Sequence, residues 1–172
     1  MNVQYAGIVV LLANVLLYFS FKQYIYRNSY KRSDSFYPVS KITASFKYIK
    51  YIIYSGILIQ LLRCSSQEPT SFALLIGGVL AITGWLLLSV SLWTLGANFS
   101  PCNEGRLPSK FITTGIYRVI RHPVYLGNVL QIIGILFWCP GMWIGISLTL
   151  AVVFYGFSIA DEEKSRMHFN NK

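Results

Sequence analysis

The side chains best suited to chemistry gather in two short stretches of the second half of the chain. Residues 117–125 include arginines, an imidazole and two phenols, and residues 161–163 are three consecutive carboxylates. Carboxylates accept strong hydrogen bonds, and aromatic faces attract cations, so such a set could bind a polar or cationic ligand. The candidates are Tyr117, Arg121, His122, Tyr125, Glu162 and Glu163.

Each candidate also has a plain structural interpretation. Arg121 alone is typical of the charged flank of a membrane span, and tyrosines commonly lie at the membrane interface. His122 could simply precede a helix, because Pro123 is well tolerated at the first helical position. Glu162 and Glu163 could be a solvated helix end. Singly these interpretations are favoured, so a functional site requires that the two stretches meet in space.

The composition indicates the environment in which they would meet. Of 172 residues, 54% are apolar and only 12% are charged, against about 25% charged in soluble domains. This length fits one domain, here residues 1–172. The net charge of +9 is better explained by membrane topology and anionic lipid than by nucleic acid, because no basic stripe lies on a soluble fold. We therefore expect membrane lipids as partners and no nucleic acid.

The apolar segments predict an all-α membrane protein with about five transmembrane helices. The charge-free stretch from Val124 to Ala160 is too long for one span, and Pro140-Gly141 marks a turn within it. The last two spans should therefore form a tight hairpin, and the first stretch reads as a retained span rather than a signal peptide. The predicted spans are 3–21, 46–62, 72–95, 124–138 and 142–160.

In this predicted topology, nearly all basic residues lie on one side of the membrane. Segments 22–50 and 96–123 and the C-terminal tail hold fourteen of the fifteen lysines and arginines, and Arg63 is the remaining one. With five crossings, these three segments share one face of the membrane. The positive-inside rule then places the N-terminus outside and the C-terminus in the cytoplasm.

The predicted hairpin brings His122 and the acidic run to the same inner face. Polar groups at a membrane boundary are costly unless they are paired or used. Adjacent helical positions point about 100° apart, so we expect one of Glu162 and Glu163 to face His122 and the other to point away.

The three cysteines show no pattern of chemical interest. Cys64, Cys102 and Cys139 have no ligand spacing, so we expect neither a disulfide framework nor a metal site. Cys64 and Cys139, at span ends, are interpreted as packing residues.

The order of these residues resembles that of a known family. Thr114-Gly115-Ile116-Tyr117, then Arg121-His122-Pro123-x-Tyr125-x-Gly127, an apolar hairpin and a pair of glutamates are similar to the isoprenylcysteine carboxyl methyltransferase and phospholipid methyltransferase family. The resemblance covers about residues 95–169 and includes the five-span topology.

The resemblance implies a pocket for S-adenosylmethionine, or its product S-adenosylhomocysteine, on the inner face over about residues 109–169. It implies methyl transfer to a lipophilic or lipidated acceptor, such as a prenylcysteine-like carboxylate or a lipid amine. Glu162 is favoured over Glu163 when the chain is aligned on His168-Phe169. The cofactor residues that it implies are Phe111, Ile112, Tyr117, Arg121, His122, Pro123, Tyr125 and Glu162 or Glu163.

The chain departs from the family pattern at three places. Ser109 replaces a histidine, Ser158 replaces an arginine of the prenylcysteine enzymes, and paired tyrosines are missing after Phe169. The last two weigh against a prenylcysteine acceptor. Two alternatives stay open: an NADPH-dependent reductase of the sterol type, and a membrane protein that binds lipid or cofactor without catalysis.

Overall fold

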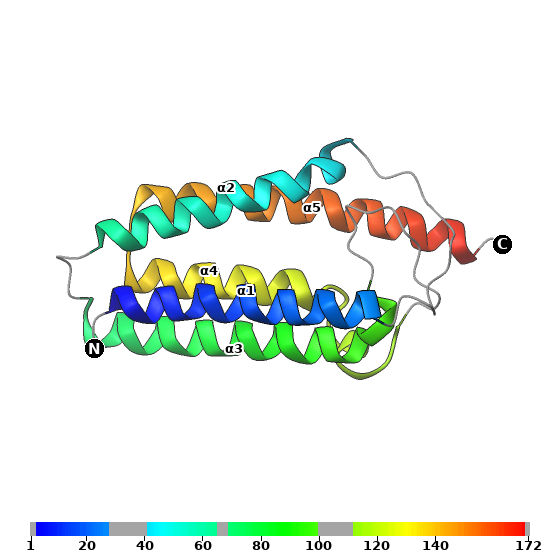
Figure 1. The fold of residues 1–172 in the computed structure, drawn as a ribbon, viewed down its shortest axis with the longest axis horizontal. Helices are drawn as coiled ribbons and strands as arrows, with labels where there is room; N and C mark the ends of the chain where they lie inside the picture. Colours follow the sequence, from blue (N-terminus) through cyan, green and yellow to red (C-terminus); the bar gives the residue numbers. More distant parts are fainter. Residues whose placement is uncertain (1–2, 28–40, 65–68, 100–111, 171–172) are drawn as a thin grey trace.

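The computed structural model describes residues 3–27, 41–64, 69–99 and 112–170, and these residues are mostly helical and contain no strand. The all-α prediction is therefore confirmed. Two short 3-10 turns, η2 (Gly96–Asn98) and η4 (Gly115–Arg118), lie between the third and fourth helices. The α-helices are α1 (Val3–Arg27), α2 (Lys41–Arg63), α3 (Ser71–Leu95), α4 (Pro123–Trp138) and α5 (Met142–Asn170) (Figure 1).

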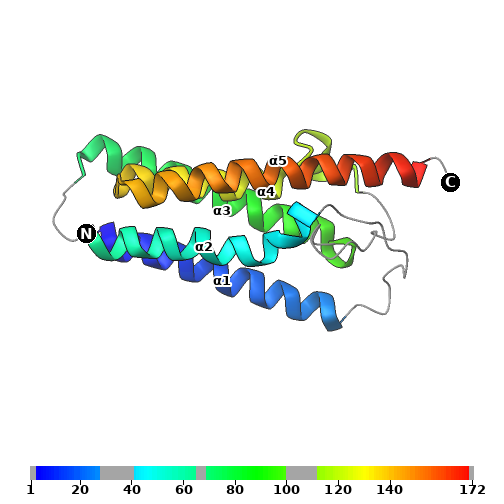
Figure 2. The ribbon, with the colours of Figure 1, turned by 90° about the horizontal axis from the view of Figure 1, so that it is seen from above.

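The helices run side by side along the long axis in two layers. Figure 1 shows α1, α3 and α4 in one layer and α2 with α5 in the other. In Figure 2, which looks down on the second layer, α5 lies in front of α4 and α2 lies in front of α1. The turn between α4 and α5 lies at one end of this bundle, called here the Pro140 end. The start of α4 and the last turns of α5 lie at the opposite end, called here the His122 end.

Local signals in the sequence set the ends of the helices. The Thr70 hydroxyl accepts a hydrogen bond from the amide of Ala73 (3.2 Å) and so caps the start of α3. Gly96, at a φ of 50°, ends the same helix. Pro123 begins α4. The predicted turn at Pro140-Gly141 is confirmed, because α4 ends at Trp138 and α5 starts at Met142.

Glycines bring α3 and α4 into backbone contact. A Cβ added to Gly84 would lie 2.5 Å from the carbonyl oxygen of Gly127, and one added to Gly127 would lie 2.7 Å from that of Gly84. Gly77 and Gly134 face each other in the same way, 2.7 Å in both directions. Each helix carries its two glycines seven residues apart, which is about two turns, so they share one face. Small residues of this kind allow close packing without a hydrophobic driving force.

Three helices are long and apolar enough to cross a membrane: Gln4–Phe21, Ser71–Leu95 and Met142–Met167. Helix α4 is apolar but shorter, and α2 is not among them. The prediction of about five spans is therefore not confirmed by length and composition. The helices also outrun the predicted spans, since α5 continues to Asn170. Charged residues end a span at the membrane boundary, but they remain good helix formers.

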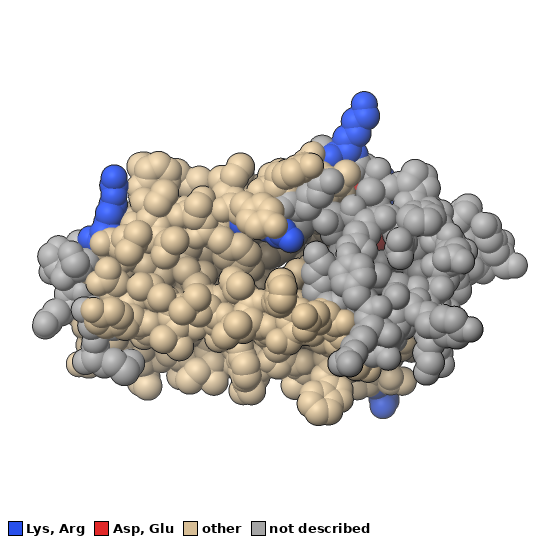
Figure 3. Space-filling model, viewed as in Figure 1, with Lys and Arg blue, Asp and Glu red and all other residues tan. Residues whose placement is uncertain are grey.

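The outward surface suits a lipid environment. Large apolar side chains on α1 and α3 are exposed, among them Leu16, Leu75 and Ile82. Figure 3 shows a mostly uncharged surface along the middle of the described part of the bundle. In water such a surface would be unstable, whereas in hydrocarbon it is the expected one.

One prediction about the cysteines is wrong. Cys64 and Cys139 form a disulfide, with their Cα atoms 5.8 Å apart and their positions separated by 75 in sequence. The bond joins the end of α2 to the turn between α4 and α5, at the Pro140 end. Sequence spacing carried no sign of it, because the folding of the whole bundle brings the two residues together.

Candidate functional site

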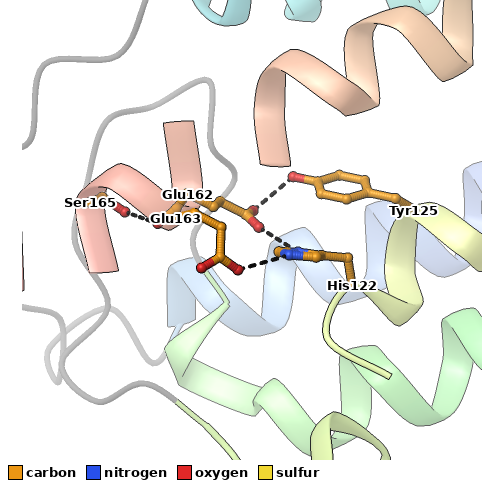
Figure 4. Close-up of polar contacts among 5 residues, drawn as sticks. All are labelled: His122, Tyr125, Glu162, Glu163 and Ser165. Atoms are coloured by element: carbon orange, nitrogen blue, oxygen red, sulfur yellow. Dashed lines mark hydrogen bonds and ion pairs between the residues drawn. The ribbon is translucent and has the colours of Figure 1, made fainter. Parts of the chain in front are cut away.

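His122 occupies the N-cap position of α4, at the His122 end of the bundle. Its backbone (φ −128°, ψ 61°) lies outside the helical region, and the buried Pro123 starts the helix immediately after it. The imidazole therefore leaves the helix end instead of packing along the helix side. It points toward the last turns of α5, as Figure 4 shows.

Two carboxylates of α5 hold this imidazole. His122 Nδ1 lies 3.0 Å from Glu162 Oε2, and His122 Nε2 lies 3.2 Å from Glu163 Oε1. The predicted meeting of His122 with the acidic run is thus present in the structure. The expectation that only one glutamate would face His122 is wrong, because a ring with nitrogens on two edges reaches adjacent side chains that diverge from one helix.

This geometry favours a charged histidine. A neutral imidazole has one N–H, so one of its nitrogens would direct a lone pair at a carboxylate, whereas the imidazolium donates from both. The hydrogen bond with Glu162 is the main cause that raises the pKa of His122, with Glu163 adding to it and burial opposing it. The two carboxylates and one imidazolium together carry a net negative charge.

Tyr125 extends the cluster into the bundle. Its hydroxyl donates to Glu162 Oε1 at 2.7 Å. Its ring stacks on His122, with the centroids 6.1 Å apart, and on Tyr155, with the centroids 4.9 Å apart. Sequence reasoning missed Tyr155, although it lies seven residues before Glu162, on the same face of α5. The result is an aromatic column that ends at the carboxylates.

Tyr117 lies near the same carboxylate but is held differently. It belongs to η4, and its buried hydroxyl finds no hydrogen bond of normal geometry among the described residues. Neighbouring Ser91 donates its own hydroxyl hydrogen to the carbonyl of Leu87. Burial, together with the negative charge of Glu162, raises the pKa of Tyr117. The phenol therefore stays protonated and can donate a hydrogen bond to a ligand.

The other predicted residues contribute less. Arg121 is exposed and forms no ion pair within the described part of the chain. Ile112 is half-buried. Phe111 lies outside the described residues. A contact that the sequence did not indicate comes from α2, where the buried Thr43 donates to Asp161 Oδ2 at 2.6 Å and so ties α2 to the acidic run.

A family model for phospholipid methyltransferase matches residues 72–170, which is more than half of the chain. The chain belongs to the phospholipid methyltransferase family. The matched region runs from α3 to α5 and contains every contact between His122, Tyr125 and the two glutamates. No match is found to a curated protein or to a solved structure.

Family membership confirms the resemblance seen in the sequence and extends it toward the N-terminus, to the start of α3. Together with the three apolar helices, it indicates an integral membrane protein of a methyltransferase family. Helices α1 and α2 lie outside the matched region. The family-specific part of the chain is thus the α3–α4 pair, the turn η4 and α5.

Proposed function

We propose that this protein transfers a methyl group from S-adenosylmethionine to the amine of a membrane lipid. The observation that carries the proposal is the cluster at the His122 end, where His122, Tyr125, Glu162 and Glu163 meet. Family membership supports methyl transfer as the reaction class.

The residues present fit this cofactor in charge and in chemical character. S-adenosylmethionine is a cation with an amino group, ribose hydroxyls and an adenine ring. The net negative cluster suits the positive groups, the aromatic column that contains Tyr125 and Tyr155 suits the adenine or the sulfonium, and the Tyr117 hydroxyl, which has no hydrogen-bond partner among the described residues, offers a donor. The proposed cofactor-binding set also includes Phe111, Ile112, Arg121 and Pro123.

The work left to the protein is mainly positioning. When bound, S-adenosylmethionine supplies a methyl group already activated on a sulfonium, whose sulfur keeps the electron pair as the methyl leaves. Glu162 would hold the positive groups of the cofactor, and Tyr125 and His122 fix the position of both of its oxygens. We assign Glu163 to accept the proton that an acceptor ammonium must lose before its nitrogen can attack. Alignment of the two reactants can supply much of the acceleration.

The acceptor is better matched as an amine than as a carboxylate. Ser158, which replaces the arginine of the prenylcysteine enzymes, is buried in α5 with 2% of its surface exposed. A carboxylate acceptor would need a cation there, and serine offers none. A lipid ammonium instead meets the negative cluster.

We further propose that the His122 end faces the cytoplasm. Fourteen of the fifteen lysines and arginines fall in the three segments predicted to share that face. The Cys64–Cys139 disulfide lies at the opposite end, and disulfides persist in oxidising compartments outside the cytosol. The two arguments are independent and give the same orientation, with the N-terminus outside.

Methyl transfer is tested with purified protein, labelled S-adenosylmethionine and two acceptors. We expect label on phosphatidylethanolamine in vesicles and none on a prenylcysteine. Binding of NADPH in place of S-adenosylhomocysteine would favour the reductase. Binding of S-adenosylhomocysteine without turnover on any lipid would favour a non-catalytic protein. His122→Ala should lower the turnover, while Gln60→Leu at the Pro140 end serves as the control.

Orientation is tested separately with a membrane-impermeant maleimide on intact cells. In a Cys102→Ser background that keeps the disulfide, Arg63→Cys should label at once and Arg118→Cys only after the membrane is opened. Both positions are exposed. Labelling of both from the same side would contradict the proposed topology.

A further inference from the structure

Two amide side chains meet in the middle of the bundle. Asn14 lies near the centre of α1 and Gln131 near the centre of α4, and only 7% and 2% of their surfaces are exposed. The Asn14 amide nitrogen donates to the Gln131 side-chain oxygen. This hydrogen bond links α1, which lies outside the family match, to α4, which lies within it.

A single hydrogen bond leaves half of each amide unused. Within the described part of the chain, Asn14 Oδ1 and Gln131 Nε2 are buried and have no hydrogen-bond partner. Turning both amides by 180° exchanges the oxygen and nitrogen of each side chain, but the number of hydrogen bonds between them stays the same. One acceptor and one donor remain open in either arrangement.

Unpaired polar atoms are costly at this depth. An amide taken from water into an apolar medium without a partner loses several kcal/mol, and native proteins rarely leave such groups unsatisfied. Gly84 of α3 passes close by, since a Cβ there would lie 2.8 Å from Gln131 Cγ. The bundle thus accommodates a polar side chain at a position where leucine would be the ordinary choice.

The pair is separate from the candidate cofactor site. Gln131 follows His122 by nine residues, which places it about 13 Å further along the helix axis. The hydrogen bonds and ion pairs that join His122, Tyr125 and the two glutamates to one another in the described part of the chain involve neither amide. A ligand held by the amides would sit well inside the membrane-spanning part of the bundle.

We propose that Asn14 and Gln131 form a binding site for a hydroxyl group within the bundle. A hydroxyl matches the open atoms because its hydrogen donates to the free carbonyl oxygen while its oxygen accepts from the free amide. The group belongs either to a trapped water or to the alcohol of a lipophilic molecule. The proposal concerns binding alone and is independent of methyl transfer.

The test uses the wild-type protein in lipid nanodiscs with its glutamine and asparagine side chains labelled with ¹⁵N. Gln131→Leu identifies the Gln131 amide signal. We expect that signal to shift saturably with 1-decanol but not with decane, if the occupant is an alcohol. A cross-peak to water that decanol leaves unchanged identifies a trapped water. An amide that contacts neither, or that responds equally to decane, overturns the proposal.

Variants give a second readout. If decanol binds, Asn14→Leu should weaken it about tenfold, the usual cost of one buried hydrogen bond. The matched control is Gln60→Leu, because Gln60 is also an amide but donates to the carbonyl of Pro140 at 3.3 Å. That variant should change the affinity less than twofold. If water is the occupant, its cross-peak to the Gln131 amide should disappear in Asn14→Leu and persist in Gln60→Leu. An unchanged affinity or cross-peak in Asn14→Leu would contradict the site.

Discussion

The α3–α4 pair and the α2–α5 pair are held together by different means. In the first pair, glycines bring the two backbones into direct contact at Gly84 and Gly127. In the second, side chains and polar links make the contact, as where Ser147 donates to the carbonyl of Ile53 at 3.1 Å. The α2–α5 layer is also tied at both ends, by Thr43 to Asp161 and by the disulfide beyond α2.

The candidate site lies where these two kinds of packing meet. His122 and Tyr125 come from α4, which is locked to α3, while the two glutamates come from α5, which is tied to α2. The distance between imidazole and carboxylates therefore depends on how the two layers sit on each other. The α3–α4 pair positions the imidazole, and the α2–α5 pair positions the carboxylates that contact it.

The largest effect is expected from breaking the backbone contact. Gly84→Val would place a Cβ 2.5 Å from the Gly127 carbonyl, so the helices must move apart. We expect a loss of about 3 kcal/mol or more in the free energy of unfolding, measured by thermal melting in detergent. Gly145→Ala in α5 is the control, because the added Cβ would meet no atom of the described residues within 4 Å apart from its own helix backbone and chain neighbours. Equal stability of the two variants would show that the glycine contact does not hold α3 against α4.

A smaller loss is expected from cutting the tie at the Pro140 end. Cys139→Ser, or reduction of the wild-type protein, removes the link between α2 and the α4–α5 turn. Typical disulfides contribute about 2 kcal/mol or more, so the melting temperature should fall by several degrees. Cys102→Ser leaves the bond in place and should melt like the wild type. A variant without the bond that melts at the wild-type temperature would show that packing alone holds this end.

Substitutions of the two glutamates should differ in how much they weaken cofactor binding. Glu162→Gln weakens contacts to both His122 and Tyr125, whereas Glu163→Gln weakens a contact to His122. We expect the affinity for S-adenosylhomocysteine to fall about tenfold in the first variant and about threefold in the second. Titration calorimetry measures both. Negligible effects in both would mean that the carboxylates are only the end of a helix.

The smallest effect concerns pH. Since the folded pKa of His122 is raised, its pairing contributes stability that is fully present below the unfolded value of about 6.5. That stability is lost as the pH rises through the raised pKa. The melting temperature should therefore fall on the order of 2 °C more in the wild type than in His122→Gln, given the partial exposure of the groups. Parallel pH profiles would argue against a charged His122.

Much of the site followed from the sequence because it depends on local signals. Pro140-Gly141 predicted the turn, and a hairpin of two apolar arms returns His122 and Glu162 to the same end of the bundle. The glycine contact also has a signal in the sequence, since Gly77 and Gly84, like Gly127 and Gly134, are seven residues apart.

The features that were missed depend on packing between distant helices. The Cys64–Cys139 bond joins residues that no spacing relates, and the contact between Asn14 and Gln131 spans 117 positions. In the sequence, Tyr155 is one of several aromatic residues in an apolar stretch. Only the placement of α5 against α4 brings it onto Tyr125. Such contacts follow from the arrangement of the layers, which helical periodicity alone does not specify.

The shortness of α4 has a consequence for where the reaction takes place. Its sixteen residues extend about 24 Å, whereas the hydrocarbon layer is about 30 Å thick. If the end of α4 lies level with the start of α5 at the Pro140 end, His122 stops short of the far boundary of the hydrocarbon layer, just below the lipid ester groups. An acceptor lipid would then reach the carboxylates by sliding sideways within its leaflet, without its chains ever leaving the bilayer.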